Sequence, residues 1–202
     1  IADLLTLISK NMNAQAAFGS GCTTGYVDDA SQHYGQLKGG SLFSKGQFYG
    51  AGPSDTRTQV KVFHIEGFWG ERWDRLAGLI YENGVWKAKM TGEGGGYNLT
   101  GAGYTAVCRG VPHSGTDSFW SWQKEVKQTE FGRFPVGELT GGDQSYEADY
   151  HWVNNHIVAV CLAGASCADG WGCGPRALDA CHAAGAAWWG LGASLSLVGP
   201  SL

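Results

Sequence analysis

The sequence predicts an α+β domain with small antiparallel sheets, few helices and long ordered glycine-rich loops. Glycine supplies 33 of the 202 residues, well above its usual share of about 7%, and each glycine inside a helix costs about 1 kcal/mol relative to alanine. Short β-branched and aromatic runs alternate with turn residues, which is typical of strands. With 43% hydrophobic residues, the chain can bury a core, so disorder is excluded.

The first predicted element is a helix over residues 2–18, where apolar residues recur at roughly helical spacing. Gly19 and Gly21 follow this segment and would end the helix. From there to Gly52 the sequence is rich in Gly, Ser, Thr and Tyr, which predicts loops and a small sheet element. We therefore divide the chain into an N-terminal extension, residues 1–55, and a main domain, residues 56–202.

The main domain is predicted to consist of short strands joined by loops. The predicted strands cover residues 60–63, 77–82, 85–90, 131–136, a buried stretch within 150–162 and a closing strand at 193–198. Asn83 and Gly84 separate two alternating apolar runs, which is the strongest short-range signal for a β-hairpin. From residue 163 onward alanine and glycine dominate, and only Asp169, Arg176 and Asp179 are charged. Because glycines interrupt every helical window there, we expect ordered loops on short strands.

Charge and hydropathy exclude two classes of partner. The chain has 14 Lys and Arg against 18 Asp and Glu, a net charge of −4, and no window is basic enough for a nucleic-acid site. No apolar run reaches the 18–20 or so residues of a membrane-spanning helix, so membrane insertion is not expected. Charged residues make up only 16% of the chain, and such a surface is often devoted to binding a partner.

The cysteines do not have the spacing of a zinc site. Cys161, Cys167, Cys173 and Cys181 are separated by five, five and seven residues, whereas zinc ligands favour pairs two to four residues apart. His182 beside Cys181 makes a metal conceivable, but small buried thiols or one or two disulfides are the stronger interpretation. No metal is therefore predicted. Standard nucleophile, phosphate-loop and zinc-protease motifs are also absent from the sequence, so no catalytic residues are expected.

Three short motifs carry a resemblance to a known family. Phe68-Trp-Gly-Glu-Arg-Trp-Asp-Arg is followed by Ala163-Gly-Ala-Ser-Cys167 and then by Gly192-Ala-Ser-Leu195. In this order they resemble the signatures of the formylglycine-generating-enzyme branch of the C-type lectin fold, over roughly residues 60–197. The resemblance implies a C-type lectin fold for the main domain.

Further segments are similar to phage and prophage tail proteins that are diversified by retroelements. The resembling segments are Val60-Lys-Val-Phe, Gly96-Tyr-Asn-Leu-Thr-Gly, Gly132-Arg-Phe-Pro and Cys173-Gly-Pro175. Such retroelements mutate template adenines, so an asparagine codon yields alanine, aspartate, histidine, cysteine or glycine but no stop. These residue types stand where the family has asparagine. The resemblance implies a variable region at about residues 163–195.

The resemblance divides the C-terminal residues into two sets. The exchangeable positions, implied to contact a ligand, are Ala168, Asp169, Trp171, Gly172, Asp179, Cys181, His182, Gly185, Ala186, Trp188 and Gly190. The scaffold positions, implied to hold the fold, are Trp69, Trp73, Gly164, Gly174, Arg176, Trp189 and Gly192. For Trp171 and Trp188 a packing role and a contact role are both open.

The resemblance implies a binding protein rather than an enzyme. The expected function is that of a receptor-binding adhesin in a phage or prophage tail, on the virion or a cell surface, which determines host tropism by contacting a host-cell protein or glycan. Such proteins form homotrimers, and the N-terminal extension would pack on the domain or support the trimer. Two alternatives remain open: a cysteine oxidase similar to the formylglycine-generating enzyme, and a calcium-dependent lectin using the Trp152–Asn155 segment. No cofactor is expected, although Asp143, Glu147 or Asp149 could hold a structural calcium ion.

Overall fold

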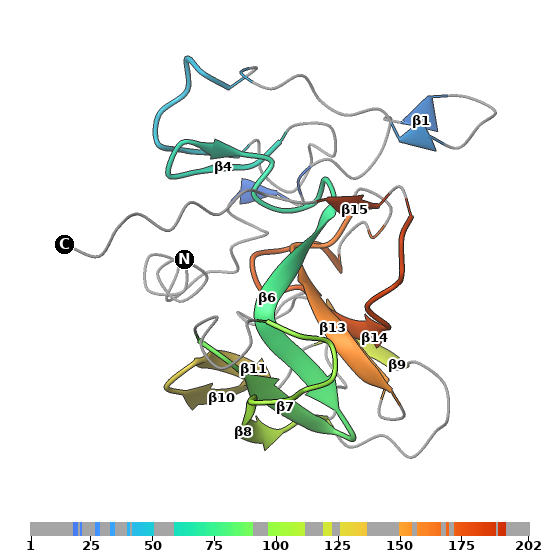
Figure 1. Ribbon diagram of the computed structural model, residues 1–202. Helices are drawn as coiled ribbons and strands as arrows, with labels where there is room; N and C mark the ends of the chain where they lie inside the picture. The colour runs from blue at the N-terminus through green and yellow to red at the C-terminus, as the bar shows by residue number, and fades with distance from the viewer. Residues whose placement is uncertain are drawn as a thin grey trace.

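Among the residues that the structure describes, regular secondary structure is almost entirely β-strand (Figure 1). The computed structural model describes residues 18–19, 21, 27–28, 33–34, 40, 42–50, 59–90, 97–111, 119–122, 126–136, 150–154, 157–166, 169, 172–188 and 190–192. Within these residues the protein is nearly all β, a curled sheet that forms a half-barrel, so the α+β prediction is wrong. The described residues form no helix that is long and apolar enough to cross a membrane.

In the main domain, the residues that the structure describes between strands form turns and irregular segments. Where a connection is fully described, as at Asn83-Gly84, it is too short to hold a helix. The predicted helix over residues 2–18 lies outside the described residues except for Phe18. The closing strand predicted at 193–198 also lies outside them. The division into residues 1–55 and 56–202 stays a prediction.

One large sheet organises the main domain. Its strand order is β8 (Thr105–Arg109), β7 (Val85–Ala88), β6 (Trp73–Glu82), β13 (Val158–Ala163), β14 (Leu178–His182), β12 (Tyr150–Val153) and β9 (Phe119–Trp122). The short β15 (Leu191–Gly192) pairs in parallel with the start of β6, and β12 pairs in parallel with β14. In Figure 1 the long β6 crosses the molecule beside β13. The C-terminal segment therefore returns to the centre of the sheet.

Three smaller sheets surround this one. β1 (Val27–Asp28) pairs with β2 (His33–Tyr34), and β10 (Val126–Thr129) pairs with β11 (Gly132–Pro135). β3 (Phe48–Tyr49), β4 (Lys61–Val62) and β5 (Ile65–Glu66) form a three-stranded sheet. Glu66 accepts hydrogen bonds from the backbone N–H groups of Gly40, at 2.8 Å, and Leu42, at 3.1 Å. A carboxylate of this small sheet thus fixes a neighbouring loop.

The predicted hairpin is confirmed. β6 and β7 pair in antiparallel register with Glu82 opposite Val85, so only Asn83 and Gly84 form the turn. Both have positive φ, 50° and 76°, as a type I′ hairpin turn requires. Local turn chemistry therefore determined the register of two central strands.

Two apolar cores lie on opposite faces of the large sheet. The first core consists of Val60, Val62, Trp69, Trp73, Leu162, Ala165, Cys173 and Ala177. The second core consists of Tyr81, Trp86, Cys108, Phe134, Val153, Ala159, Cys161 and Ala180. Because successive side chains in a strand point to opposite faces, the neighbours Cys161 and Leu162 contribute to different cores. Both faces of β13 are therefore buried.

A β-bulge interrupts the pairing of β13 with β14. Val160 pairs with His182, but Leu162 pairs with Asp179, so two steps along β13 correspond to three along β14. The extra residue reverses the alternation of side chains in β14. Asp179 and His182 consequently lie on the same face of the sheet, although their separation in sequence would place them on opposite faces.

Candidate functional site

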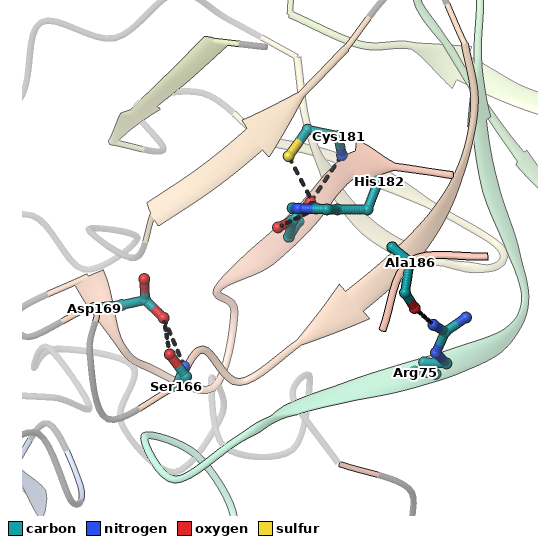
Figure 2. A network of polar contacts seen from close by, with 7 residues as sticks. Arg75, Ser166, Asp169, Cys181, His182 and Ala186 are labelled. Atoms are coloured by element: carbon teal, nitrogen blue, oxygen red, sulfur yellow. Dashed lines mark hydrogen bonds and ion pairs between the residues drawn. The ribbon is translucent and has the colours of Figure 1, made fainter. Parts of the chain in front are cut away.

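The bulge brings three of the positions predicted to be exchangeable into contact at the end of β14 (Figure 2). Asp179 Oδ1 accepts a hydrogen bond from the backbone N–H of Cys181 at 2.8 Å. The Nδ1 atom of His182 lies 3.1 Å from Asp179 Oδ2 and 3.1 Å from Cys181 Sγ. The site therefore combines a carboxylate, a thiol and an imidazole within one short segment.

Burial differs strongly among these three side chains. The Asp179 side chain is 5% exposed, whereas that of His182 is 36% exposed, and Cys181 is half-buried. Burial and the nearby Asp179 carboxylate raise the pKa of the Cys181 thiol, so the thiol stays protonated near neutral pH. The hydrogen bond to Asp179 raises the pKa of His182. A protonated imidazole beside the carboxylate is favoured in this arrangement.

The His182 ring is also held by an aromatic contact. Its centroid lies 4.4 Å from that of Trp188, with an interplanar angle of 34°. Trp188 in turn packs against the first core as a half-buried side chain. The Trp188 ring contacts the face of the imidazole, whereas the polar contacts of His182 are made by Nδ1 at the ring edge. Trp188 thus has a packing role as well as partial exposure.

Arg75 of β6 holds the loop that follows β14. Its Nη1 donates to the carbonyl oxygen of Ala184 at 2.9 Å, and its Nη2 donates to that of Ala186. Figure 2 shows the guanidinium reaching from β6 to Ala186. Within the loop, Ala183, Gly185 and Ala187 are exposed, and the residues between them are half-buried. Sequence reasoning missed Arg75 because a contact with a distant main-chain carbonyl leaves no motif.

Asp169 stabilises its own loop. Its Oδ2 accepts hydrogen bonds from the backbone N–H and the hydroxyl of Ser166, both at 2.7 Å (Figure 2). The loop is closed further by backbone bonds from Asp169 N to Ser166 O and from Gly172 N to Asp169 O. Burial raises the pKa of the Asp169 carboxyl. In this chain Asp169 is therefore part of the loop structure.

The three described glycines among the exchangeable positions have different surroundings. A Cβ at Gly172 would lie 2.1 Å from the ring of Tyr150, and one at Gly190 would lie 2.7 Å from Nε1 of Trp188. A Cβ at Gly185 would meet nothing within 4 Å. Gly185 can therefore accept a side chain without displacement, whereas Gly172 cannot.

We predict that Gly172→Ala lowers the free energy of unfolding by about 1–3 kcal/mol, the usual cost of overpacking. The matched substitution Gly185→Ala should change it by less than about 0.5 kcal/mol, as surface substitutions usually do. Urea unfolding of both variants measures the difference. Equal stabilities would show that Tyr150 moves aside freely and that Gly172 is as exchangeable as Gly185.

Four of the six scaffold positions that the structure describes are buried. Trp69 and Trp73 are 1% and 4% exposed, Gly174 is buried and Arg176 is half-buried. Gly164, with φ 89°, donates its N–H to Ala177 O and accepts from Gly70 N. Gly192 lies in β15 opposite Asp74 of β6. These positions connect the C-terminal segment to the start of β6.

An aromatic row at the sheet edge was not included among the predicted site residues. Trp120 of the edge strand β9 is 54% exposed, and its ring lies 5.1 Å from that of Tyr150. Tyr150 contacts Trp152, which contacts the buried Trp73. Cross-strand register places Trp120, Trp152 and Asp179 on one face of the sheet. The only sequence signal was the clustering of Trp120 and Trp122 in a polar stretch.

Several predicted residues lie outside the described residues: Ala168, Trp171, Trp189, Asn155, Asp143, Glu147 and Asp149. Their roles stay predictions. None of the described cysteines, Cys108, Cys161, Cys173 and Cys181, is in a disulfide bond. Cys173 donates to the carbonyl oxygen of Ser166 at 3.1 Å, which gives this thiol a structural contact.

No protein-family model, curated protein or solved structure matches this chain. The fold and the site define a nearly all-β domain whose C-terminal loop is held by a distant arginine. A mixed carboxylate, thiol and imidazole cluster lies at the base of that loop.

Proposed function

We propose that this chain is the ligand-binding domain of a phage or prophage tail adhesin, in which a retroelement diversifies residues at about 163–195. The ligand would be a host-cell surface protein or glycan. The observation that carries the proposal is the contact of Arg75 with the main chain of the loop after β14. The proposed activity is binding without chemistry.

Holding a loop through its carbonyl oxygens makes the loop conformation independent of its side chains. The hydrogen bonds from Arg75 to Ala184 and Ala186 are accepted by main-chain carbonyl oxygens, which every residue type supplies. Between and beside them, Ala183, Gly185 and Ala187 are exposed. Recognition commonly uses such loops on a rigid scaffold, because side chains there can change without disturbing the core. The arrangement supports a display segment in which sequence can vary.

Aromatic side chains near this segment could anchor a ligand. Trp120 is exposed and is supported by Tyr150, while Trp188 is half-buried beside His182. Tryptophan and tyrosine contribute large contact area at low cost in side-chain entropy and are enriched at binding hot spots. In contrast, the exposed loop residues of this copy are alanine and glycine, which contribute shape rather than binding energy. We therefore expect weak binding per site, which a trimer would strengthen through avidity.

We predict that Arg75→Ala weakens binding of the labelled chain to susceptible bacterial cells by about tenfold. Without the hydrogen bonds from Arg75, ordering the loop on binding would cost roughly 1–1.5 kcal/mol of binding free energy. Arg75→Lys should restore little, because an ammonium lacks the planar fork that reaches two carbonyl groups together. Flow cytometry over a panel of bacterial strains provides the measurement.

Gln128→Ala serves as the control, since Gln128 is exposed on β10 and lies in a separate hairpin. Unchanged cell binding by Arg75→Ala would overturn the assignment, and loss of binding in Gln128→Ala would place the contact surface elsewhere. The diversification itself is tested in the genome. A reverse-transcriptase gene and a near-copy of the coding region for residues 163–195 should lie next to this gene, and their absence would remove the retroelement from the proposal.

A further inference from the structure

We propose that Asp179, Cys181 and His182 form a binding site for a zinc ion. Each residue offers one ligand atom, and these atoms all lie within 4.8 Å of one another. The Nδ1 atom of His182 is 3.1 Å from Cys181 Sγ and 3.1 Å from Asp179 Oδ2. In a tetrahedral zinc site, bond lengths of 2.0–2.3 Å place neighbouring ligand atoms about 3.3–3.6 Å apart. The two separations from His182 would have to widen by a few tenths of an ångström, whereas Asp179 and Cys181, within 4.8 Å of each other, would have to adjust to the same spacing.

The donor atoms identify the class of metal. One sulfur, one imidazole nitrogen and one carboxylate oxygen suit zinc and similar borderline-soft divalent ions. Calcium and magnesium prefer sites made of oxygen ligands alone. Three protein ligands also leave a fourth coordination position, which in zinc proteins is taken by water or by a group of a ligand.

The fold positions these side chains before any ion binds, and a bound zinc ion would displace the proton of the Cys181 thiol and that of the His182 Nδ1 atom to solvent. The bulge between β13 and β14 brings His182 to the same face as Asp179, and Trp188 fixes the imidazole ring from another direction. Asp179 is in turn held by the backbone N–H of Cys181. Little conformational entropy would therefore be lost when an ion binds.

This inference departs from the sequence-level expectation of no metal. That expectation rested on the spacing between cysteines, whereas the site uses one cysteine with its neighbours in β14. The inference also stands without the proposed function. If the retroelement proposal is correct, all three ligands occupy exchangeable positions, and the zinc site is then a property of this copy of the protein.

The test is titration of the reduced, full-length chain with Co²⁺, a spectroscopic substitute for zinc. We expect a thiolate-to-cobalt charge-transfer band that saturates at about one ion per chain and disappears when Zn²⁺ is added. Cys181→Ser should abolish the band. His182→Gln should lower cobalt affinity more than about 100-fold, beyond the 10–100-fold typical of losing an outer hydrogen-bond partner.

Cys108→Ser is the matched control, because Cys108 lies in β8 and belongs to the second core. This variant should keep the band, as should Cys22→Ser and Cys167→Ser. A wild-type chain without the band, or a band that survives in Cys181→Ser, would overturn the proposal. Circular dichroism checks folding. If Cys181→Ser does not fold, His182→Gln decides, and unchanged cobalt affinity in that variant would overturn the proposal.

Discussion

Replacing Trp69 with alanine should lower the free energy of unfolding by about 3–5 kcal/mol, as truncation of a buried tryptophan does. Trp69 is 1% exposed and belongs to the first core. Its ring makes edge contacts with Phe18 and Phe68, at centroid distances of 6.2 and 6.0 Å. The indole N–H also donates to the carbonyl oxygen of Gly19 at 3.0 Å. The substitution would remove apolar contacts and leave a buried acceptor without this donor.

Urea unfolding of Trp69→Ala and of the matched variant Trp120→Ala provides the measurement. Trp120 is 54% exposed, so its truncation should cost less than about 1 kcal/mol. Trp69→Phe keeps most of the ring but loses the hydrogen bond to Gly19, so we expect an intermediate loss of about 1–3 kcal/mol. Similar losses for Trp69→Ala and Trp120→Ala would contradict the assignment of Trp69 to the core.

The parts of the fold that followed from the sequence are those with local causes. The hairpin between β6 and β7 was predictable because Asn83 and Gly84 adopt the positive φ angles of a tight turn. The sequence did not predict that β15 pairs with the start of β6, nor that β12 pairs with β14. These pairs are parallel and join distant segments, so neither turn chemistry nor alternation of apolar residues specifies them.

The prediction of the fold class was wrong for a related reason. A helical spacing of apolar residues near the N-terminus suggested an α+β domain, but strands form the regular elements of the described residues. Periodicity in one segment says nothing about how the many short strands of the remaining chain assemble. The curled sheet results from pairing among those strands, and that pairing is a long-range property.

The residues of the candidate site were singled out from the sequence as ligand contacts, a role that stays a prediction, whereas their geometry could not be foreseen. Asp179, Cys181 and His182 were marked by resemblance to a family, as positions that would face a ligand. Their contact with one another depends on one extra residue in β14, and strict strand alternation would have separated Asp179 from His182. Asp179 is also almost fully buried, which a loop-like, glycine-rich sequence does not indicate.

His151 should make the protein markedly less stable in mild acid. It is 0% exposed, and neither ring nitrogen has a hydrogen-bond partner in the part of the chain that the structure describes. Burial lowers the pKa of His151 from 6.5 to about 4. The unfolded chain therefore binds more protons than the folded chain between these values, so stability is full above pH 6.5 and falls as the pH decreases. At about 1.4 kcal/mol per pKa unit, the loss by pH 4 is about 3 kcal/mol.

The surroundings of His151 indicate which variant isolates its contribution. The ring lies edge-on to Phe119 at 6.3 Å, and its cross-strand partners are Ser121 and Leu178. Neither the Phe119 nor the Leu178 side chain carries a charge that could stabilise an imidazolium. His151→Phe supplies a ring that does not titrate, so urea unfolding between about pH 7 and pH 4 should show a shallower loss of stability than in the parent chain.

His182→Gln supplies a control of opposite sign. The contact with Asp179 raises the pKa of His182, so its stabilising contribution is present below pH 6.5 and is lost as the pH rises through the folded-state pKa. His182→Gln removes this contribution, so the free energy of unfolding should fall more steeply in acid than in the parent chain. The difference should be small, because the His182 ring is partly exposed. If His151→Phe loses stability in acid as steeply as the parent chain, groups other than the buried histidine cause the pH dependence.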